Sequence, residues 1–293
     1  MSHDRYHLEG RRVRAAFDAA AAGYDAVAVV QAEVRARLLE RLELFRLAPQ
    51  RILDAGCGTG HGTRALLRHY RRAGVVALDL APGMLAQARR QRPWWRRLDP
   101  VCADAAALPL ADASVDLVFS NLMLQWCNEP DAVFREFRRV LRPGGLLLFA
   151  TFGPDTLKEL RAAWSAADGH THVSRFIDMH DLGDALVRAG LAEPVMDVEH
   201  LTLTYADLRS LMRDLKTMGA SNATAGRNRG LTGRQRLAAA EAHYERLRRD
   251  GRLPATWEVV YGHAWAPTAA ARPAPDADGA VTVPLTDIGR RRR

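Results

Sequence analysis

Apolar residues along this chain form short runs that alternate with stretches of helical periodicity. Five runs between residues 51 and 151 are each bounded by glycine, proline or aspartate, as buried parallel strands are. Between residues 9 and 47 the apolar positions instead recur at helical spacing, which predicts N-terminal helices. The residues at this spacing are Val27, Val30, Val34, Leu38, Leu42 and Phe45. The pattern is typical of an α/β fold.

The remainder of the chain extends this pattern. Residues 181–189 predict a helix that ends at Gly190, and residues 195–204 and 257–265 alternate well enough to be a sixth and a seventh strand. Two insertions, 153–178 and 205–252, fall outside the alternation; the second contains one amphipathic helix around residues 208–215. The tail, 266–293, is rich in Ala, Pro and Asp, with a short edge strand expected at 281–285 and a solvated arginine run at 290–293.

Length and composition agree with a soluble enzyme. The chain is long enough for one large α/β domain with insertions or for two small domains, and we expect a single domain over residues 1–293. The chain has 293 residues, of which 48% are hydrophobic and 26% charged, and no apolar run approaches the ~20 residues that span a membrane. The N-terminus lacks the hydrophobic segment of a signal peptide. The three cysteines form no C-x-x-C pair, so we expect reduced thiols and a cytoplasmic location.

The formal net charge of +8 is unevenly distributed. Residues 205–252 hold ten arginines and one lysine against five acidic residues, a local net charge of +6. A second basic run, 89–97, interleaves Trp94 and Trp95 with arginines, which could stack on single-stranded nucleic acid. Because this run ends a predicted helix, where cations are favoured by the helix dipole, we expect no nucleic-acid partner.

Chemistry is concentrated in the segment 52–60, Ile-Leu-Asp-Ala-Gly-Cys-Gly-Thr-Gly. An apolar strand meets glycines at alternate positions and then helix-compatible sequence, so a ligand can approach the backbone and the helix N-terminus. The spacing is neither the dinucleotide G-x-G-x-x-G nor a P-loop. About twenty residues later, Asp79 ends a second apolar run, where such an acid accepts hydrogen bonds from ribose hydroxyls; this acid alone does not separate S-adenosylmethionine (SAM) from NAD.

These segments, in this order, resemble the motifs of the class I SAM-dependent methyltransferases. Residues 101–105 are similar to the family's segment at the edge of the adenine, and residues 115–122 are similar to its motif IV. Residues 140–149 are similar to the helix, Pro-Gly-Gly turn and strand that follow. Residues 17–25 are similar to the family's N-terminal segment, in which a tyrosine closes on SAM. The resemblance implies a Rossmann-like seven-stranded sheet, six strands parallel and one antiparallel, with residues 51–151 as the SAM-binding core and the two insertions as a helical lid. The cofactor-binding residues that it implies are Tyr24, Asp54, Gly56, Gly58, Gly60, Asp79, Leu80, Met84, Asp104, Ala105 and Asn121.

The insertions carry a narrower resemblance. Residues 151–160, 175–181, 215–222 with 231–234, and 258–265 look like the malonyl-acyl-carrier-protein O-methyltransferase (BioC) family of biotin synthesis. This resemblance implies methyl transfer from SAM to the free carboxylate of a malonyl thioester, leaving S-adenosylhomocysteine. It implies an acidic acyl-carrier protein bearing malonyl-phosphopantetheine, or malonyl-CoA, as partner. We expect no membrane partner and a monomer.

Such a reaction needs no general base, because a carboxylate with a pKa near ~4 is ionised at neutral pH. We therefore assign no catalytic residue. An arginine fork suits a carboxylate best, which makes Arg175 the candidate substrate contact, with Tyr24 and His180 as neighbours. His170 and His172 have neither the helical spacing nor the cysteine partners of zinc ligands, so we expect no metal.

Two alternatives remain open. The chain could be a class I methyltransferase acting on a free small molecule, such as a quinone precursor or another carboxylic acid. It could also be an RNA-binding methyltransferase or a non-catalytic SAM-binding module. The retained Asp54, Asp79 and motif glycines argue against loss of catalysis.

Overall fold

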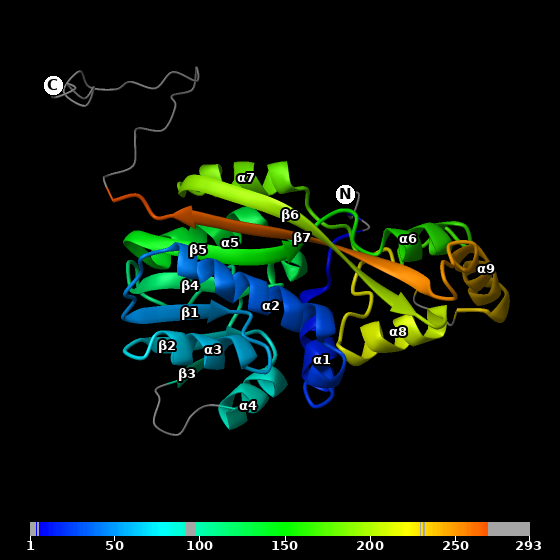
Figure 1. The fold of residues 1–293 in the computed structure, drawn as a ribbon, viewed down its shortest axis with the longest axis horizontal. Helices are drawn as coiled ribbons and strands as arrows, with labels where there is room; N and C mark the ends of the chain where they lie inside the picture. The colour runs from blue at the N-terminus through cyan, green and yellow to red at the C-terminus, as the bar shows by residue number, and fades with distance from the viewer. Residues whose placement is uncertain (1–3, 5, 92–97, 229, 231, 269–293) are drawn as a thin grey trace, which may run out of the picture.

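The computed structural model describes residues 4, 6–91, 98–228, 230 and 232–268 (Figure 1). Within them, seven strands form one sheet in the order β3-β2-β1-β4-β5-β7-β6. The antiparallel strand is β7 (Leu253–Trp265), which lies between β5 and β6 (Ala192–Tyr205). The parallel strands expected between residues 51 and 151 are β1 (Arg51–Ala55), β2 (Gly74–Asp79), β3 (Leu98–Cys102), β4 (Val115–Asn121) and β5 (Leu141–Phe152). The expected sheet of six parallel strands and one antiparallel strand is confirmed.

The order of the strands reverses at β1. The strands β2 and β3 extend the sheet on one side of β1, and β4 and β5 extend it on the other. Loops that leave the carboxyl ends of β1 and β4 therefore diverge, and a crevice opens between them. This topology places a ligand site at the loops that follow β1, β2, β3 and β4.

Helices cover both faces of the sheet. One face packs against α2 (Val29–Arg41) and α3 (His61–His69), and the other against α5 (Pro130–Val140) and α7 (Met179–Arg188) (Figure 1). Side chains alternate along each strand, so Ile52 joins the first core and its neighbour Leu53 joins the second. In β1, β2, β4 and β5 side chains on both faces are buried, which explains why these strands read as continuous apolar runs.

The N-terminal region is helical, as the periodicity predicted. It consists of α1 (Gly10–Ala20), a 3-10 turn at Tyr24–Ala26, α2, and a second 3-10 turn at Leu42–Leu44. The helix α4 (Pro82–Gln91) follows β2. The basic run after residue 91, with Trp94 and Trp95, and the tail after residue 268 lie outside the described residues.

The two insertions contribute three helices beside the carboxyl ends of the parallel strands (Figure 1). The first insertion contains α6 (Lys158–Ser165), and the second contains α8 (Leu208–Thr217) and α9 (Arg234–Glu245). Helix α8 is the amphipathic helix that the sequence predicted, with Leu208, Leu211 and Leu215 buried. Helix α6 packs against α9 and β7. Among the described residues, no helix combines the length and apolar character needed to cross a membrane.

One local prediction was wrong. The Pro143-Gly144-Gly145 segment was expected to form a turn before a strand, but it lies inside β5, which begins at Leu141. The pairing of β4 with β5 shifts from Val115 opposite Leu141 to Leu117 opposite Leu146, so the segment is a bulge. Gly144 has a φ of +76° there, a conformation that favours glycine.

Candidate functional site

A cavity of about 390 Å³ lies at the carboxyl ends of the strands around β1. Its volume falls in the range of about 300–1,000 Å³ that is typical of small-molecule sites. Nine of the eleven predicted cofactor-binding residues line it: Tyr24, Gly56, Gly58, Asp79, Leu80, Met84, Asp104, Ala105 and Asn121. The other two, Asp54 and Gly60, do not line the cavity.

Each of the motif positions Gly56, Gly58 and Gly60 requires glycine, but not all for the same structural reason. A Cβ on Gly56 would lie 2.5 Å from the Cβ of Met123, and one on Gly60 would lie 2.8 Å from the Cα of Ala88. These two glycines therefore allow neighbouring segments to pack closely. A Cβ on Gly58 would meet no atom within 4 Å, and Gly58 has a φ of +53°. Because Gly58 also lines the cavity, its missing side chain leaves space for a ligand.

Asp79, at the end of β2, connects the glycine loop to the next loop. One carboxylate oxygen accepts a hydrogen bond from the backbone N–H of Gly58 (2.9 Å), and the other accepts one from Ala81 (2.9 Å). Burial raises the pKa of this carboxyl group, while these backbone donors oppose the shift. The side chain thus holds the loop in place and still faces the cavity.

Asp54 lies behind the loop and is buried in β1. Its carboxylate accepts a hydrogen bond from Thr63 Oγ1 of α3 (2.5 Å). Burial, followed by the charge of Asp79, raises the pKa of Asp54 to about 7, and Thr63 and Arg35 act in the opposite direction. Arg35, from α2, was not predicted; burial lowers its pKa, and its charge interacts with Tyr24 and Asp25 as well as Asp54.

The opposite wall of the cavity comes from α2, the end of β5, the segment after α8, and β7. Its residues are Gln31, Phe152, Met218, Ala220 and Trp257. Gln31 Nε2 lies 3.5 Å from the sulfur of Met218, and the Nδ2 of Asn121 donates to the carbonyl of Gln31 (3.3 Å).

Three polar atoms around this cavity lack a protein partner. Gln31 Oε1, Asn121 Oδ1 and Trp257 Nε1 are buried and make no hydrogen bond within the described part of the chain. Sequence reasoning missed Gln31 and Trp257, because a lone glutamine on a helix and a tryptophan on a strand have no motif that distinguishes them from core residues.

Arg175 and His180, the other predicted substrate contacts, are exposed and do not line the cavity. The imidazole Nδ1 of His180 is hydrogen-bonded to a carboxylate oxygen of Asp178 (2.7 Å), and Asp178 is the N-cap residue of α7. The structure therefore does not bring these two residues together with Tyr24, which lies in the cavity wall and whose pKa is raised by burial. A substrate contact for Arg175 or His180 stays a prediction.

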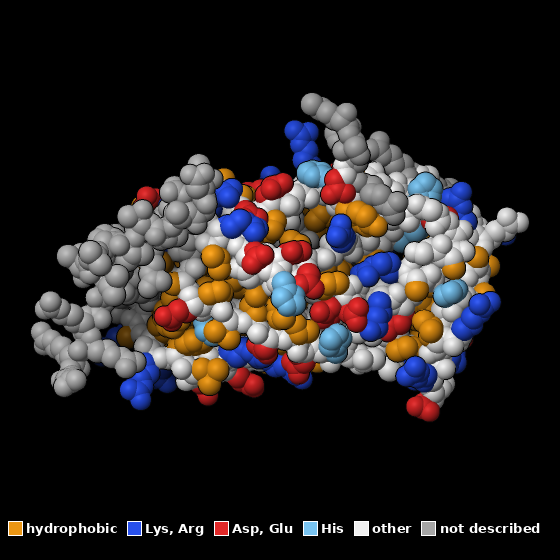
Figure 2. Space-filling model, turned by 90° about the horizontal axis from the view of Figure 1, so that it is seen from above, with side chains coloured by type: hydrophobic (Ala, Val, Ile, Leu, Met, Phe, Trp, Pro, Cys, Tyr) orange, Lys and Arg blue, Asp and Glu red, His pale blue; other side chains and the backbone are white. Residues whose placement is uncertain are grey.

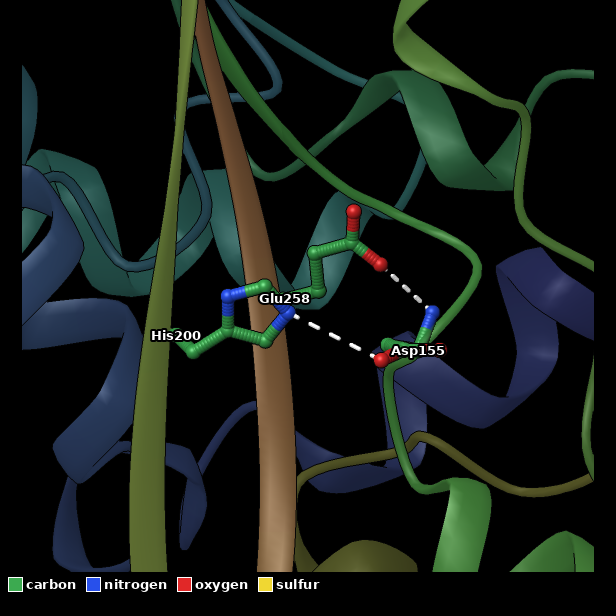
Figure 3. Close-up of side chains that lie close together, drawn as sticks. All are labelled: Asp155, His200 and Glu258. Carbon is green, nitrogen blue, oxygen red and sulfur yellow. Dashed lines mark hydrogen bonds and ion pairs between the residues drawn. The ribbon is translucent and has the colours of Figure 1, made fainter.

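A separate polar cluster fastens the start of the first insertion to the sheet (Figure 3). It contains Asp155 from the loop after β5, His200 from β6 and Glu258 from β7, with ligand-type atoms within 4.8 Å of one another. Glu258 accepts a hydrogen bond from the backbone N–H of Asp155 (2.5 Å), and Asp155 pairs with Lys158 Nζ (2.8 Å) and lies 3.8 Å from His200 Nε2. The hydrogen bond from Lys158 lowers the pKa of Asp155. These partners account for the cluster as an anchor of the first insertion.

The sheet order and the cavity at the switch point define a class I methyltransferase fold. A family described as a methyltransferase domain matches residues 53–149. Two solved structures share the fold: the YcgJ protein from Bacillus subtilis (TM-score 0.59, 15% identity, covering 81% of this chain and 99% of that one) and the [4+2]-cyclase SpnF (TM-score 0.50, 23% identity, covering 81% of each chain).

Closer relatives narrow this class. The chain is 57% identical over 275 residues to the malonyl-[acyl-carrier protein] O-methyltransferase of Methylovorus sp. (strain MP688), covering 92% of this chain and 93% of the relative. It is 59% identical over 278 residues to the protein of the same name from Laribacter hongkongensis (strain HLHK9), with the same coverage. The chain belongs to the malonyl-[acyl-carrier protein] O-methyltransferase family.

Proposed function

We propose that the protein transfers the methyl group of SAM to the free carboxylate of malonyl-acyl-carrier protein, giving the malonyl methyl ester and S-adenosylhomocysteine. Membership of the family, at more than half identity over nine-tenths of the chain, is the observation that carries this proposal. The ester masks the polar end of the malonyl group, which suits a first step in building the pimeloyl chain of biotin.

The charge of the cavity supports SAM as the methyl donor. Its lining residues, among those that the structure describes, include Asp79, Asp104 and Glu129 but neither lysine nor arginine. SAM carries a positive sulfonium and a positive ammonium, whereas a dinucleotide carries an anionic pyrophosphate. An acidic cavity without a cation favours the former. The open space over Gly58 fits a ligand that touches the backbone.

The cavity residues divide between the parts of SAM. Asp79 would accept hydrogen bonds from the ribose hydroxyls, and Asp104 and Ala105 would border the adenine. Gly56 and Gly58 would lie under the methionine part, with Tyr24 and Asn121 on the side of the transferred methyl. Asp54 and Gly60 support this surface from behind, through Thr63 and through the close approach of α4.

When bound, SAM supplies an electrophilic methyl group: a C–O bond to the substrate carboxylate forms while the C–S bond breaks, and the electron pair stays on sulfur. No proton moves, because the nucleophile is already ionised. The residues of this chain contribute alignment of the two reactants and exclusion of water from a charged oxygen. Phe152, Met218 and Trp257 form the apolar side of that enclosure.

The proposed carrier partner is acidic and would meet the basic second insertion. Arg213, Lys216, Arg234 and Arg236 are exposed on α8 and α9. Figure 2 shows Lys and Arg side chains at the lid end of the molecule, on the right, and mixed with acidic side chains over the middle. Arg227 differs, because it is largely buried and pairs with Glu9 (2.7 Å). We therefore assign docking to α8 and α9 and a structural role to Arg227.

Mass spectrometry of malonyl-carrier protein incubated with the protein and SAM tests this function. We expect a gain of one methyl group on the malonyl moiety and none on acetyl-carrier protein, which lacks the carboxylate. Methylation of a free small acid with no reaction of the malonyl thioester would contradict the proposal.

A further inference from the structure

We propose that the substrate carboxylate is held by uncharged donors, the indole N–H of Trp257 and the amide N–H of Gln31, and not by an arginine. This inference rests on the proposed function and assigns residues to its substrate. It begins from two side chains at the lid-side wall of the cavity, one from β7 and one from α2.

Both side chains are buried and incompletely bonded. Trp257 is 3% exposed and Gln31 is 9% exposed. The indole Nε1 of Trp257 and the amide oxygen of Gln31 have no hydrogen-bond partner among the described residues, and the amide nitrogen of Gln31 meets only the thioether of Met218, a weak acceptor. A buried polar group left without a partner is unfavourable, so one that lies in the wall of a cavity is a candidate contact for a ligand there.

The chemistry of the unpaired groups identifies the kind of ligand. An indole N–H donates and cannot accept, so Trp257 requires an acceptor atom such as oxygen. The amide of Gln31 can turn its N–H groups towards the same acceptor, since the O and N positions of an amide follow its hydrogen bonds. In the proposed reaction the acceptor at the methyl-receiving end of the substrate is the carboxylate.

No lysine or arginine of the described cavity lining competes for this role. Lysine and arginine are absent from the cavity lining in the ranges that the structure describes, and the predicted contact Arg175 is exposed outside it. The positive charge beside the carboxylate is then that of the methyl donor itself.

Uncharged donors also suit the reaction. The carboxylate loses its negative charge as the methyl group is transferred, so an ion pair with arginine would stabilise the reactant more than the transition state. Neutral N–H groups orient the carboxylate oxygen while stabilising the charged reactant less, so they raise the activation barrier less than an arginine would. The arginine fork expected from the sequence would strengthen binding at the expense of rate.

The test compares Trp257→Phe and Gln31→Leu with the wild-type protein. Each variant keeps the bulk of the side chain and removes its donors. We expect kcat/KM for malonyl-carrier protein to fall about 10- to 100-fold in each, the usual effect of deleting a hydrogen bond to a charged group. We expect affinity for S-adenosylhomocysteine to stay near the wild-type value, and the melting temperature of Trp257→Phe to fall no further than that of Trp164→Phe, which loses the same buried ring. Trp164→Phe, which alters a buried indole outside the cavity, is the matched control and should keep wild-type activity.

A second measurement separates the carboxylate from the thioester. With S-adenosylhomocysteine bound, the wild-type protein should bind malonyl-carrier protein more tightly than acetyl-carrier protein, and this preference should shrink in both variants. Equal weakening for the two carriers would assign the donors to the thioester carbonyl and overturn the inference. So would unaffected turnover in both variants, most directly if Arg175→Ala lost activity instead.

Failure of the proposed function is distinguishable from failure of this inference. A wild-type protein that binds S-adenosylhomocysteine but does not methylate malonyl-carrier protein would overturn both. An active wild-type protein with unaffected variants would overturn the assignment of Trp257 and Gln31 alone.

Discussion

Asp79 performs two tasks at the carboxyl end of β2, since it holds the backbone of the glycine loop and faces the cavity. We expect Asp79→Asn to weaken binding of SAM and S-adenosylhomocysteine by about 1–3 kcal/mol, because the charge-assisted acceptor for the ribose hydroxyls is lost. Titration calorimetry measures this change. Asp112→Asn, the same change at an exposed position outside the cavity, is the control and should have little effect. Wild-type affinity in Asp79→Asn would remove Asp79 from the site.

The buried carboxyl group of Asp54 should make the stability of the protein depend on pH. Its pKa is raised to about 7 in the folded protein, against about 4 in an unfolded chain. Between these pH values the folded state binds more protons than the unfolded state, so the contribution of Asp54 to the free energy of unfolding falls as pH rises.

Asp54→Asn has no such ionisation. The free energy of unfolding of this variant, relative to that of the wild-type protein, should therefore increase from about pH 5 to about pH 8. Urea unfolding of both ligand-free proteins at the two pH values gives the difference. Parallel pH profiles would show that Asp54 does not titrate in this window.

At the scale of helices and strands, periodicity predicted the helices that have one apolar face and the strands that are buried in the core. Helix α9 was missed because only Ala240 and Tyr244 of its residues are buried, so it carries no apolar stripe. The bounds of helix α6 were not predicted because it has eight residues, and its buried Leu160, Ala163 and Trp164 make only one turn of the helical pattern. The Pro-Gly-Gly bulge was missed because a turn and a bulge use the same residues, and only the pairing with β4 separates them.

The residues of the candidate site that follow the parallel strands could be predicted from the sequence. Asp79, Asp104 and Asn121 follow or end parallel strands, and the carboxyl ends of such strands meet at one edge of the sheet. Gln31 and Trp257 were not predictable, since the sequence does not show that these two side chains line one cavity with polar atoms unpaired. Arg175 was chosen for the chemistry of its guanidinium, which says nothing about whether it is buried.

The joint between the first insertion and β7 should contribute measurably to stability. Thr156 is fully buried; its hydroxyl donates to the carbonyl of Glu258 (3.0 Å) and accepts from its N–H (3.1 Å). We expect Thr156→Val to lower the free energy of unfolding by about 1–3 kcal/mol, because both backbone groups lose a partner. Thr202→Val, the same change at an exposed position of β6, should have little effect in the same urea unfolding experiment. Equal effects would show that the joint is unimportant.

The distribution of charge over the whole molecule predicts how it meets a carrier. Arg213, on α8, and Arg234, on α9, are exposed within the insertion that has a local net charge of +6. Arg236 is left unchanged because it lies 3.9 Å from the carboxylate of Asp168. Exposed charges act mainly on the association rate and are screened beyond about 8 Å at physiological salt. We expect the double reversal Arg213→Glu/Arg234→Glu to raise KM for malonyl-carrier protein about tenfold at low salt, and less at high salt.

The same reversal should leave affinity for SAM unchanged and should affect malonyl-CoA much less than malonyl-carrier protein, because the small substrate needs no protein surface. Steady-state kinetics with both thioesters and calorimetry with SAM supply the comparison. Arg68→Glu/Arg72→Glu, near the end of α3 and before β2, reverses as much exposed charge at the opposite edge of the sheet and is the matched control. If both double reversals raised KM equally, net charge alone would account for the effect. If KM rose equally for malonyl-CoA and for malonyl-carrier protein, α8 and α9 would be supporting the active site and would not be the docking surface.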